Sequence, residues 1–171
     1  MAAGAAVSNR EVKAVNDGKV TKKAINKNAD ATTERPVVAI RYGHLTVNGN
    51  AIDPQGKASY LWPSLSPDGT KVVYWCVGKG CFVSDLNGKN VQPVGAIRAA
   101  VWAGNDALVG MQPKDNGEYV TESKIVAYDL KTGERQVLTS DDMIAVYPSA
   151  TATRVSFTDP DGNLYYMDIN K

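Results

Sequence analysis

The sequence contains little of the material from which catalytic and metal sites are built. Its 171 residues include one histidine and two cysteines, so neither a serine triad nor a cysteine triad can be assembled convincingly. The same residues are too few to supply the four Cys or His ligands of a structural zinc site. Glycine-rich phosphate-binding loops are also absent. We therefore expect no catalytic residue, no metal and no cofactor, and a protein that is not an enzyme.

Charge of one sign and long hydrophobic runs are lacking as well. Nineteen basic residues stand against eighteen acidic ones, and the basic run 13–27 has no aromatic residue for base stacking, so we interpret it as solvated surface and expect no nucleic-acid partner. No apolar stretch approaches the roughly 20 residues that span a bilayer, so we expect no membrane insertion. The apolar start 1–7 is too short for a signal peptide and has no basic residue before it. The chain is then either cytoplasmic or an exported protein whose signal is not part of it.

What the sequence does contain is a repeat. Four short segments share a pattern of β-forming residues, and three of them have an aspartate at or next to the end. They are Val38–Arg41, Phe82–Asp85, Val126–Asp129 and Tyr166–Ile169. Taken at Arg41, Asp85, Asp129 and Asp168, the steps are 44, 44 and 39 residues. A period near 40, with turn signals every 8 to 12 residues, predicts short strands arranged in blades.

A second landmark lies between these segments. Its clearest copy is Pro63–Tyr74, and the residues 101–109 and 148–157 are degenerate copies. In the clear copy Pro67, Asp68 and Gly69 suit a tight turn between two strands. A two-residue turn at Gly78-Lys79 and another at Asn87-Gly88 would complete a sheet of four antiparallel strands. Such a sheet is apolar on both faces, so the sequence predicts an all-β protein with β-propeller-type blades, about three to four of them.

The residues from Trp62 to Tyr74, followed by Val83-Ser84-Asp85-Leu86-Asn87-Gly88, resemble the PD40 repeat of TolB-like β-propellers, a WD40-like repeat family. The resemblance covers about Pro36 to the C-terminus. It implies a non-enzymatic module for protein or ligand binding, located in the periplasm or cell envelope. The alternative is the propeller part of an enzyme, either the gating domain of a peptidase or a carbohydrate-processing propeller.

The blades divide the chain unevenly. Residues 1–35 are interpreted as a tail or a degenerate hairpin, residues 36–56 as the third and outer strands of a partial blade, and 57–96 and 97–140 as complete blades. Residues 141–171 would form a blade that lacks its outer strand. This division leaves three interpretations of the chain: the C-terminal portion of a longer propeller, a small closed ring, or a half completed by a second copy. Unpaired edges favour association, so we expect a protein partner there, either another copy or the missing propeller portion.

Three smaller hypotheses concern the two cysteines, one turn-like segment and the single histidine. If Gly78-Lys79 is a two-residue turn, Cys76 and Cys81 face each other across the hairpin, close enough for a disulfide; two buried thiols are the alternative. The segment Asp159–Asn163 resembles the start of a calcium loop, but it joins two strand-like segments and is interpreted as a β-turn. His44 is expected in an exposed turn.

Candidate binding residues lie at the inner strands and on one long connection. Aromatic residues and arginine are common interface anchors, and those at or beside the inner strands would line the channel mouth. They are Tyr60, Trp62, Arg98, Trp102 and Tyr147. The two tryptophans are alternatively packing residues between blades. The connection 111–119, with Lys114 and Tyr119, is either a projecting polar binding loop or tolerated drift.

Overall fold

The computed structural model describes residues 35–169. The chain divides into two units, residues 1–35 and residues 36–171, and everything below concerns the second. The predictions for the N-terminal tail or hairpin and for the basic run 13–27 lie outside the described residues.

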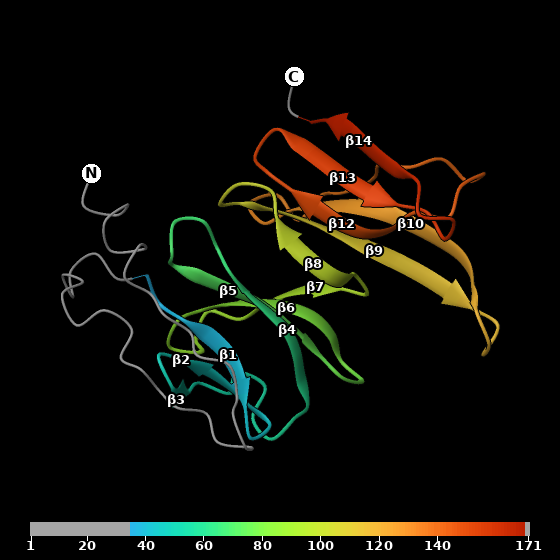
Figure 1. The fold of residues 1–171 in the computed structure, drawn as a ribbon. Helices are drawn as coiled ribbons and strands as arrows, with labels where there is room; N and C mark the ends of the chain where they lie inside the picture. Colours follow the sequence, from blue (N-terminus) through green and yellow to red (C-terminus); the bar gives the residue numbers. More distant parts are fainter. Residues whose placement is uncertain (1–34, 170–171) are drawn as a thin grey trace, which may run out of the picture. The chain divides into compact units, whose positions relative to one another are not determined.

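Fourteen described strands form four separate antiparallel sheets, and no helix is present among the described residues. Within each sheet the strands lie side by side in chain order, and successive sheets pack against one another in the same order (Figure 1). The first sheet contains β1 (Val38–Arg41), β2 (His44–Val47) and β3 (Asn50–Ala51), and the second contains β4 (Tyr60–Leu65), β5 (Lys71–Cys76), β6 (Gly80–Asp85) and β7 (Gln92–Gly95). The third contains β8 (Arg98–Trp102), β9 (Ala107–Asp115), β10 (Val120–Asp129) and β11 (Arg135–Val137), and the fourth contains β12 (Val146–Ala150), β13 (Arg154–Thr158) and β14 (Leu164–Asp168). The predicted all-β fold of propeller-type antiparallel blades is confirmed.

The sequence analysis placed Val38–Arg41 as the third strand of a partial blade. This segment, β1, is the first described strand of its sheet and packs against β4. The reason is local: Tyr42-Gly43 and Asn48-Gly49 each have two consecutive positive φ angles, near 51° and 83°. Such pairs close two-residue hairpins, so residues 38–51 fold back twice on themselves. The 44-residue step from Arg41 to Asp85 therefore relates two strands of similar sequence that differ in position: β1 is the first described strand of its sheet, and β6 is the third strand of its sheet.

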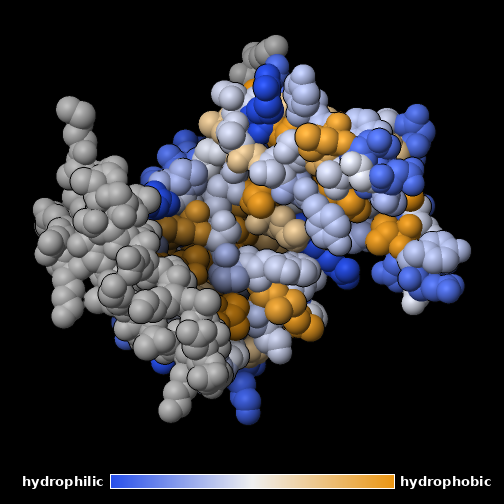
Figure 2. Space-filling view, viewed as in Figure 1, coloured by the Kyte–Doolittle hydropathy of each residue, from blue (hydrophilic) through white to orange (hydrophobic). Residues whose placement is uncertain are grey.

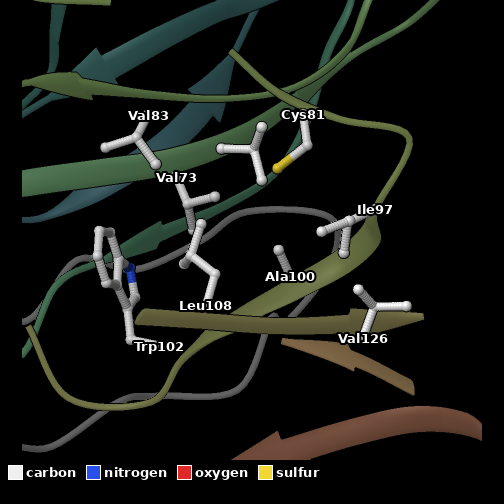
Figure 3. Close-up of a cluster of buried hydrophobic side chains, with 9 residues drawn as sticks. Val73, Cys81, Val83, Ile97, Ala100, Trp102, Leu108 and Val126 are labelled. Carbon is white, nitrogen blue, oxygen red and sulfur yellow. The ribbon is translucent and has the colours of Figure 1, made fainter. Parts of the chain in front are cut away.

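The apolar side chains lie between the sheets because each central strand is apolar on both faces. In β5 the alternation of a strand sends Val72 and Tyr74 to the cluster shared with β2 and β4, and Val73 to the opposite side. Figure 3 shows the second of these clusters, in which Val73, Cys81 and Val83 face residues of the third sheet. A further cluster lies between the third and fourth sheets and includes Val109, Ile125 and Phe157.

The turn predicted at Pro67-Asp68-Gly69 is built around a buried hydroxyl. Ser66 is fully buried; its hydroxyl donates to Asp68 Oδ1 at 2.6 Å and accepts from the Lys71 backbone N–H at 2.9 Å. The hydrogen bonds from Ser66 and Thr70 lower the pKa of Asp68 from 3.8 to about 2. The carboxylate form is thus the one that the folded turn stabilises.

Polar contacts also join this turn to the third sheet. The Asp68 backbone N–H donates to Asn105 Oδ1 at 2.9 Å, and Lys71 Nζ donates to the Asn105 carbonyl at 3.0 Å. Asp106 lies between two lysines, 3.5 Å from Lys71 Nζ and 3.1 Å from Lys131 Nζ. These contacts fix the spacing of the second and third sheets at the end where β4 and β8 terminate.

Candidate functional site

The first strands of three sheets share a backbone irregularity. The register between β4 and β5 breaks between Leu61 and Ser64, and equivalent breaks occur in β8 and β12. At each break one non-glycine residue has a positive φ, and these residues are Trp62 (51°), Ala99 (50°) and Tyr147 (51°). A bulge re-aims a side chain out of the regular alternation, so the three strands present residues at matched positions.

The conformation is costly for aromatic residues and leaves them in solvent. Bulky side chains rarely adopt positive φ, and such a conformation costs about 1–3 kcal/mol. Nevertheless Trp62 is 47% exposed and Tyr147 is 71% exposed. Each is followed by proline and serine, whereas the third bulge has Ala99-Ala100-Val101 at the same place, so this triplet accompanies only two of the three bulges.

A connected group of side chains surrounds the first bulge. The rings of Trp62 and Trp75 have centroids 6.1 Å apart, and the Arg98 guanidinium lies 5.6 Å from the centroid of the Trp75 ring. Leu61 beside them is 40% exposed. The sequence analysis did not select Trp75 as a binding residue, because Trp75 lies in an apolar run that is typical of a buried strand. We call Leu61, Trp62, Trp75 and Arg98, together with Tyr147 at the matched position of β12, the bulge surface.

Exposed apolar area alone does not single out this surface. On the face shown in Figure 2, hydrophobic residues form several separate patches with hydrophilic residues between them. The bulge surface differs from scattered exposed side chains because two of its aromatic residues, Trp62 and Tyr147, occupy matched positions in a strained conformation.

Two of the candidate mouth residues are packing residues instead. Tyr60 is 2% exposed; its hydroxyl donates to the Gly56 carbonyl at 2.7 Å and accepts from the Gln55 N–H at 2.9 Å. Burial raises the pKa of Tyr60. Trp102 is 6% exposed and packs between the second and third sheets. Tyr60 precedes the bulge of β4 and Trp102 follows the bulge of β8. Each lies on the regular part of its strand, where alternation directs its side chain inward.

Lys114 and Tyr119 lie on a hairpin rather than on a long loop. Strands β9 and β10 pair with each other beyond their pairings with β8 and β11, as far as Asp115 and Val120, and the connection is residues 116–119. Lys114 Nζ pairs with Glu122 Oε2 at 3.0 Å, and Tyr119 is 63% exposed near the tip. The structure does not bring these two residues to the bulge surface by any described contact.

The two cysteines do not face each other. In the register of β5 and β6, Cys76 pairs with Gly80 and Cys81 pairs with Trp75, so their side chains point to opposite faces of the sheet. The hairpin has a three-residue connection: Lys79 N–H donates to the Cys76 carbonyl at 3.0 Å, with Gly78 at a φ of 77°. Both thiols are free and buried, and burial raises the pKa of Cys81 to about 12. The disulfide hypothesis is thus corrected to its alternative, two buried thiols.

The segment Asp159–Asn163 forms a turn held by its first residue. Asp159 Oδ1 accepts from the N–H groups of Asp161 and Asn163, and Asp159 Oδ2 accepts from the Tyr165 hydroxyl at 3.0 Å. His44, at the start of β2, is over half exposed and its Nδ1 lies 2.5 Å from Asp53 Oδ2. Within residues 35–169, no group of three or more His, Cys, Asp or Glu side chains is arranged to hold a metal ion. The same range contains no helix long and apolar enough to cross a membrane.

No protein-family model matches the chain, and a search of curated proteins found no match. Among solved structures, it is similar to part of a tricorn protease, with a TM-score of 0.49 and 14% identity over 63% of this chain and 12% of that one. An oligogalacturonate lyase in complex with manganese gives a TM-score of 0.48 and 18% identity over 63% of this chain and 37% of that one. The AtxE2 isopeptidase gives a TM-score of 0.37 and 14% identity over 80% of this chain and 29% of that one. The chain thus covers 12–37% of these proteins, and likenesses at this level say nothing about what it binds or whether it catalyses a reaction.

Proposed function

We propose that the chain is a non-enzymatic binding module of TolB-like propeller type, which holds a protein partner or ligand at the bulge surface. The observation that carries the proposal is the matched pair of Trp62 and Tyr147, two exposed aromatic residues held at positive φ. Backbone strain of this kind is concentrated at functional sites. A glycine would remove the strain, so the aromatic side chains are expected to serve a purpose other than folding.

The chemistry of the bulge surface suits recognition of another polypeptide. Tryptophan, tyrosine and arginine are the residues that most often dominate the energy of protein interfaces. Arg98 lies over the Trp75 ring, and a guanidinium stacked on an aromatic face keeps its donors free for a carboxylate or carbonyl. We expect an acidic or carbonyl-rich segment of the partner at Arg98 and apolar side chains against Trp62 and Tyr147.

The proposed cellular location rests on the resemblance to TolB-like repeats. The Pro-Asp-Gly turn and the strands around it are the features shared with TolB-like repeats, whose family works in the periplasm or cell envelope. We propose this location for the protein to which the chain belongs.

Site-specific photocrosslinking tests the proposed function. A photoreactive phenylalanine analogue placed at Trp62 or Tyr147 should capture the same partner from the producing cells. At Tyr42, an exposed tyrosine in the β1–β2 hairpin, it should not. Trp62→Ala and Tyr147→Ala should each weaken binding of the purified partner by about tenfold or more, the effect expected of an interface anchor.

Two results would contradict the proposal. One is equal capture from all three positions, which would show that contact at the bulge surface is non-specific. The other is reproducible turnover by the purified chain on a broad panel of peptide, ester and glycoside substrates, abolished by a single substitution, which would make the module catalytic.

A further inference from the structure

In the described part of the chain, asparagine or aspartate precedes glycine at five places. They are Asn48-Gly49, Asp68-Gly69, Asn87-Gly88, Asn116-Gly117 and Asp161-Gly162. Such pairs are labile because glycine has no Cβ, so its backbone nitrogen can reach the side-chain carbonyl carbon of the preceding residue and close a cyclic imide. An amide is a better electrophile than a carboxylate, so the three asparagines are the chemically reactive members of the set.

The structure distinguishes these sites by the hydrogen bonds of the glycine nitrogens. Four of the five N–H groups are engaged at 2.9–3.1 Å: those of Gly69, Gly88 and Gly162 by backbone carbonyls and that of Gly117 by Asp115 Oδ1. The Gly49 N–H has no hydrogen bond within residues 35–169. Asn48 and Gly49 are the central residues of a two-residue hairpin turn, with φ angles of 52° and 83°. The hydrogen bond of a β-turn joins its first and fourth residues, which leaves the Gly49 nitrogen available to react.

The side-chain carbonyl of Asn48 is held by a backbone donor. The Val37 N–H donates to Asn48 Oδ1 at 2.9 Å, and the Asn48 N–H donates to the Val37 carbonyl at 2.8 Å. When the Gly49 nitrogen adds to Asn48 Cγ, negative charge develops on Oδ1, and a donor that is already in place stabilises this charge. Asn116 Oδ1 also accepts from backbone N–H groups, but the nitrogen that would attack there is itself hydrogen-bonded.

A positive charge and open solvent complete the site. Asn48 and Gly49 are exposed, and Arg41 Nη1 would lie 3.9 Å from a Cβ placed on Gly49. The Arg41 guanidinium is itself held over the Tyr42 ring, 5.4 Å from the ring centroid. A cation beside an amide favours loss of the amide proton, and the deprotonated nitrogen is the nucleophile.

We propose that Asn48 is a site of self-catalysed modification, at which the Gly49 backbone nitrogen attacks the Asn48 side-chain amide and converts the residue to aspartate and isoaspartate. A bond forms between Gly49 N and Asn48 Cγ, the bond between Cγ and Nδ2 breaks, and Nδ2 leaves as ammonia with the proton that Gly49 N loses. Solvent water then opens the imide. Breaking the bond from Gly49 N to Cγ gives aspartate, and breaking the bond to the Asn48 backbone carbonyl carbon gives isoaspartate.

Both products change the first sheet. Each adds one negative charge to a chain whose formal net charge is +1. Isoaspartate also inserts the Cβ of residue 48 into the main chain of a two-residue turn, directly beside the paired residues Val47 and Asn50. The geometry of such a turn is matched to the strands that it joins, so we expect isoaspartate to disrupt the pairing of β2 with β3. The reaction would mark the age of the chain. The site is separate from the bulge surface and does not depend on the function proposed for it.

Peptide mapping by mass spectrometry tests the site. The purified full chain is incubated at mildly alkaline pH in water enriched in heavy oxygen, so that each residue converted through the imide carries one solvent oxygen. A protein-isoaspartate methyltransferase assay detects the isoaspartate. Asn48 should convert at least about tenfold faster than Asn87 or Asn116, a difference of ~1.4 kcal/mol in activation free energy. In urea the three asparagines should react at similar rates, because each is followed by glycine and the folded environment is gone.

Variants of the chain test the two groups that promote the reaction. Val37→Pro removes the donor to Asn48 Oδ1 and keeps the Val37 carbonyl, and it should slow conversion of Asn48 in the folded chain by about threefold to tenfold. Arg41→Gln should slow it by about twofold to threefold, the effect of an exposed charge. Neither variant should change the rate in urea. Trp62→Ala is the control and should leave the rate unchanged, so failure here and failure at the bulge surface are distinguishable.

Three outcomes would overturn the inference. One is conversion of Asn87 or Asn116 as fast as that of Asn48 in the folded chain. Another is an Asn48 that stays intact in the folded chain while all three asparagines convert in urea. The third is faster conversion of Asn48 in Val37→Pro, which would show that the hydrogen bond protects the amide; the first two comparisons use the unaltered chain and hold even if this variant fails to fold.

Discussion

The indole N–H of Trp102, on the first strand of the third sheet, donates a hydrogen bond of 2.9 Å to the carbonyl of Ser64, on the first strand of the second sheet. The bond crosses between two sheets that share no strand pairing, in a region where Trp102 is 6% exposed. It therefore ties the packing of the two sheets to one directional contact, beside the bulge that displays Trp62.

Trp102→Phe should destabilise the chain by about 1–2 kcal/mol, because the Ser64 carbonyl loses its donor in a partly buried site. Trp102→Ala should cost about 3–5 kcal/mol, since a cavity is added to the lost bond. Urea denaturation followed by circular dichroism measures both. Trp62→Phe, at an exposed tryptophan, is the control and should change stability by less than about 0.5 kcal/mol; equal effects at the two positions would show that the cross-sheet bond contributes nothing.

Gly88 and Gly78 have nearly the same backbone conformation but different surroundings. Their φ angles are 75° and 77°, but a Cβ at Gly88 would lie 2.5 Å from the Ile52 carbonyl oxygen, whereas a Cβ at Gly78 would meet nothing within 4 Å. Gly78→Ala should therefore cost about 1–2 kcal/mol from backbone strain alone. Gly88→Ala should cost clearly more, because it also separates the β6–β7 turn from the segment after β3. Thermal unfolding of the two variants tests this, and equal losses would contradict the close contact.

The features that could be predicted from sequence are those decided within a few residues. The turn at Pro67-Asp68-Gly69 and the strands on either side needed only local turn chemistry and β-forming residues. The relation between Cys76 and Cys81 was predicted wrongly because a positive φ at Gly80 (106°) allows a three-residue connection, and a shift of one residue reverses the face of a side chain.

The bulges at Trp62 and Tyr147 were not predictable in the same way. Both residues were selected as aromatic candidates, but their exposure depends on a register break between strands that no single segment encodes. Tyr60 shows the converse: the same kind of residue, two positions before Trp62, is buried because it lies on the regular side of that break.

The thiols should be unreactive in the folded chain. Cys76 is fully buried, Cys81 is 2% exposed and the pKa of Cys81 is raised to about 12, so little thiolate is available to an aromatic disulfide reagent. We expect negligible labelling of the native chain near pH 8 and labelling of both thiols after unfolding in urea. Mild oxidation should leave the intact mass unchanged; the loss of two hydrogens from the native chain would instead indicate a bond between the two cysteines.

The turn at Asp68 should make stability depend on acidity. The folded-state pKa of about 2 lies below the ordinary value of 3.8, so the folded state favours the carboxylate and this stabilisation is present above about pH 4. It is lost as the pH falls from about 4 toward 2, because the unfolded chain binds the proton first. Asp68→Asn should lower stability at neutral pH and flatten its decline over that interval.

The measurement for Asp68 is the urea midpoint as a function of pH. Glu118→Gln, which makes the same change of net charge at an exposed position on the β9–β10 connection, is the control for long-range charge effects. If the two variants alter the midpoint in parallel at every pH, the effect belongs to net charge and the hydrogen bonds from Ser66 and Thr70 do not matter.

Strain at Tyr147 can be measured by comparing glycine with alanine at one position. Because its φ is 51°, Tyr147→Gly should be about 1 kcal/mol more stable than Tyr147→Ala, which keeps a Cβ in the left-handed region. At Leu61, which has no positive φ, the order should reverse, with the glycine variant about 0.5–1 kcal/mol less stable than the alanine variant. Chemical denaturation of the four variants gives both differences. The same order at the two positions would mean that Tyr147 is unstrained, and would remove the observation on which the function of the bulge surface rests. A reversal, with partner binding lost in both Tyr147 variants, would show that the chain retains a destabilising conformation in order to present an aromatic side chain.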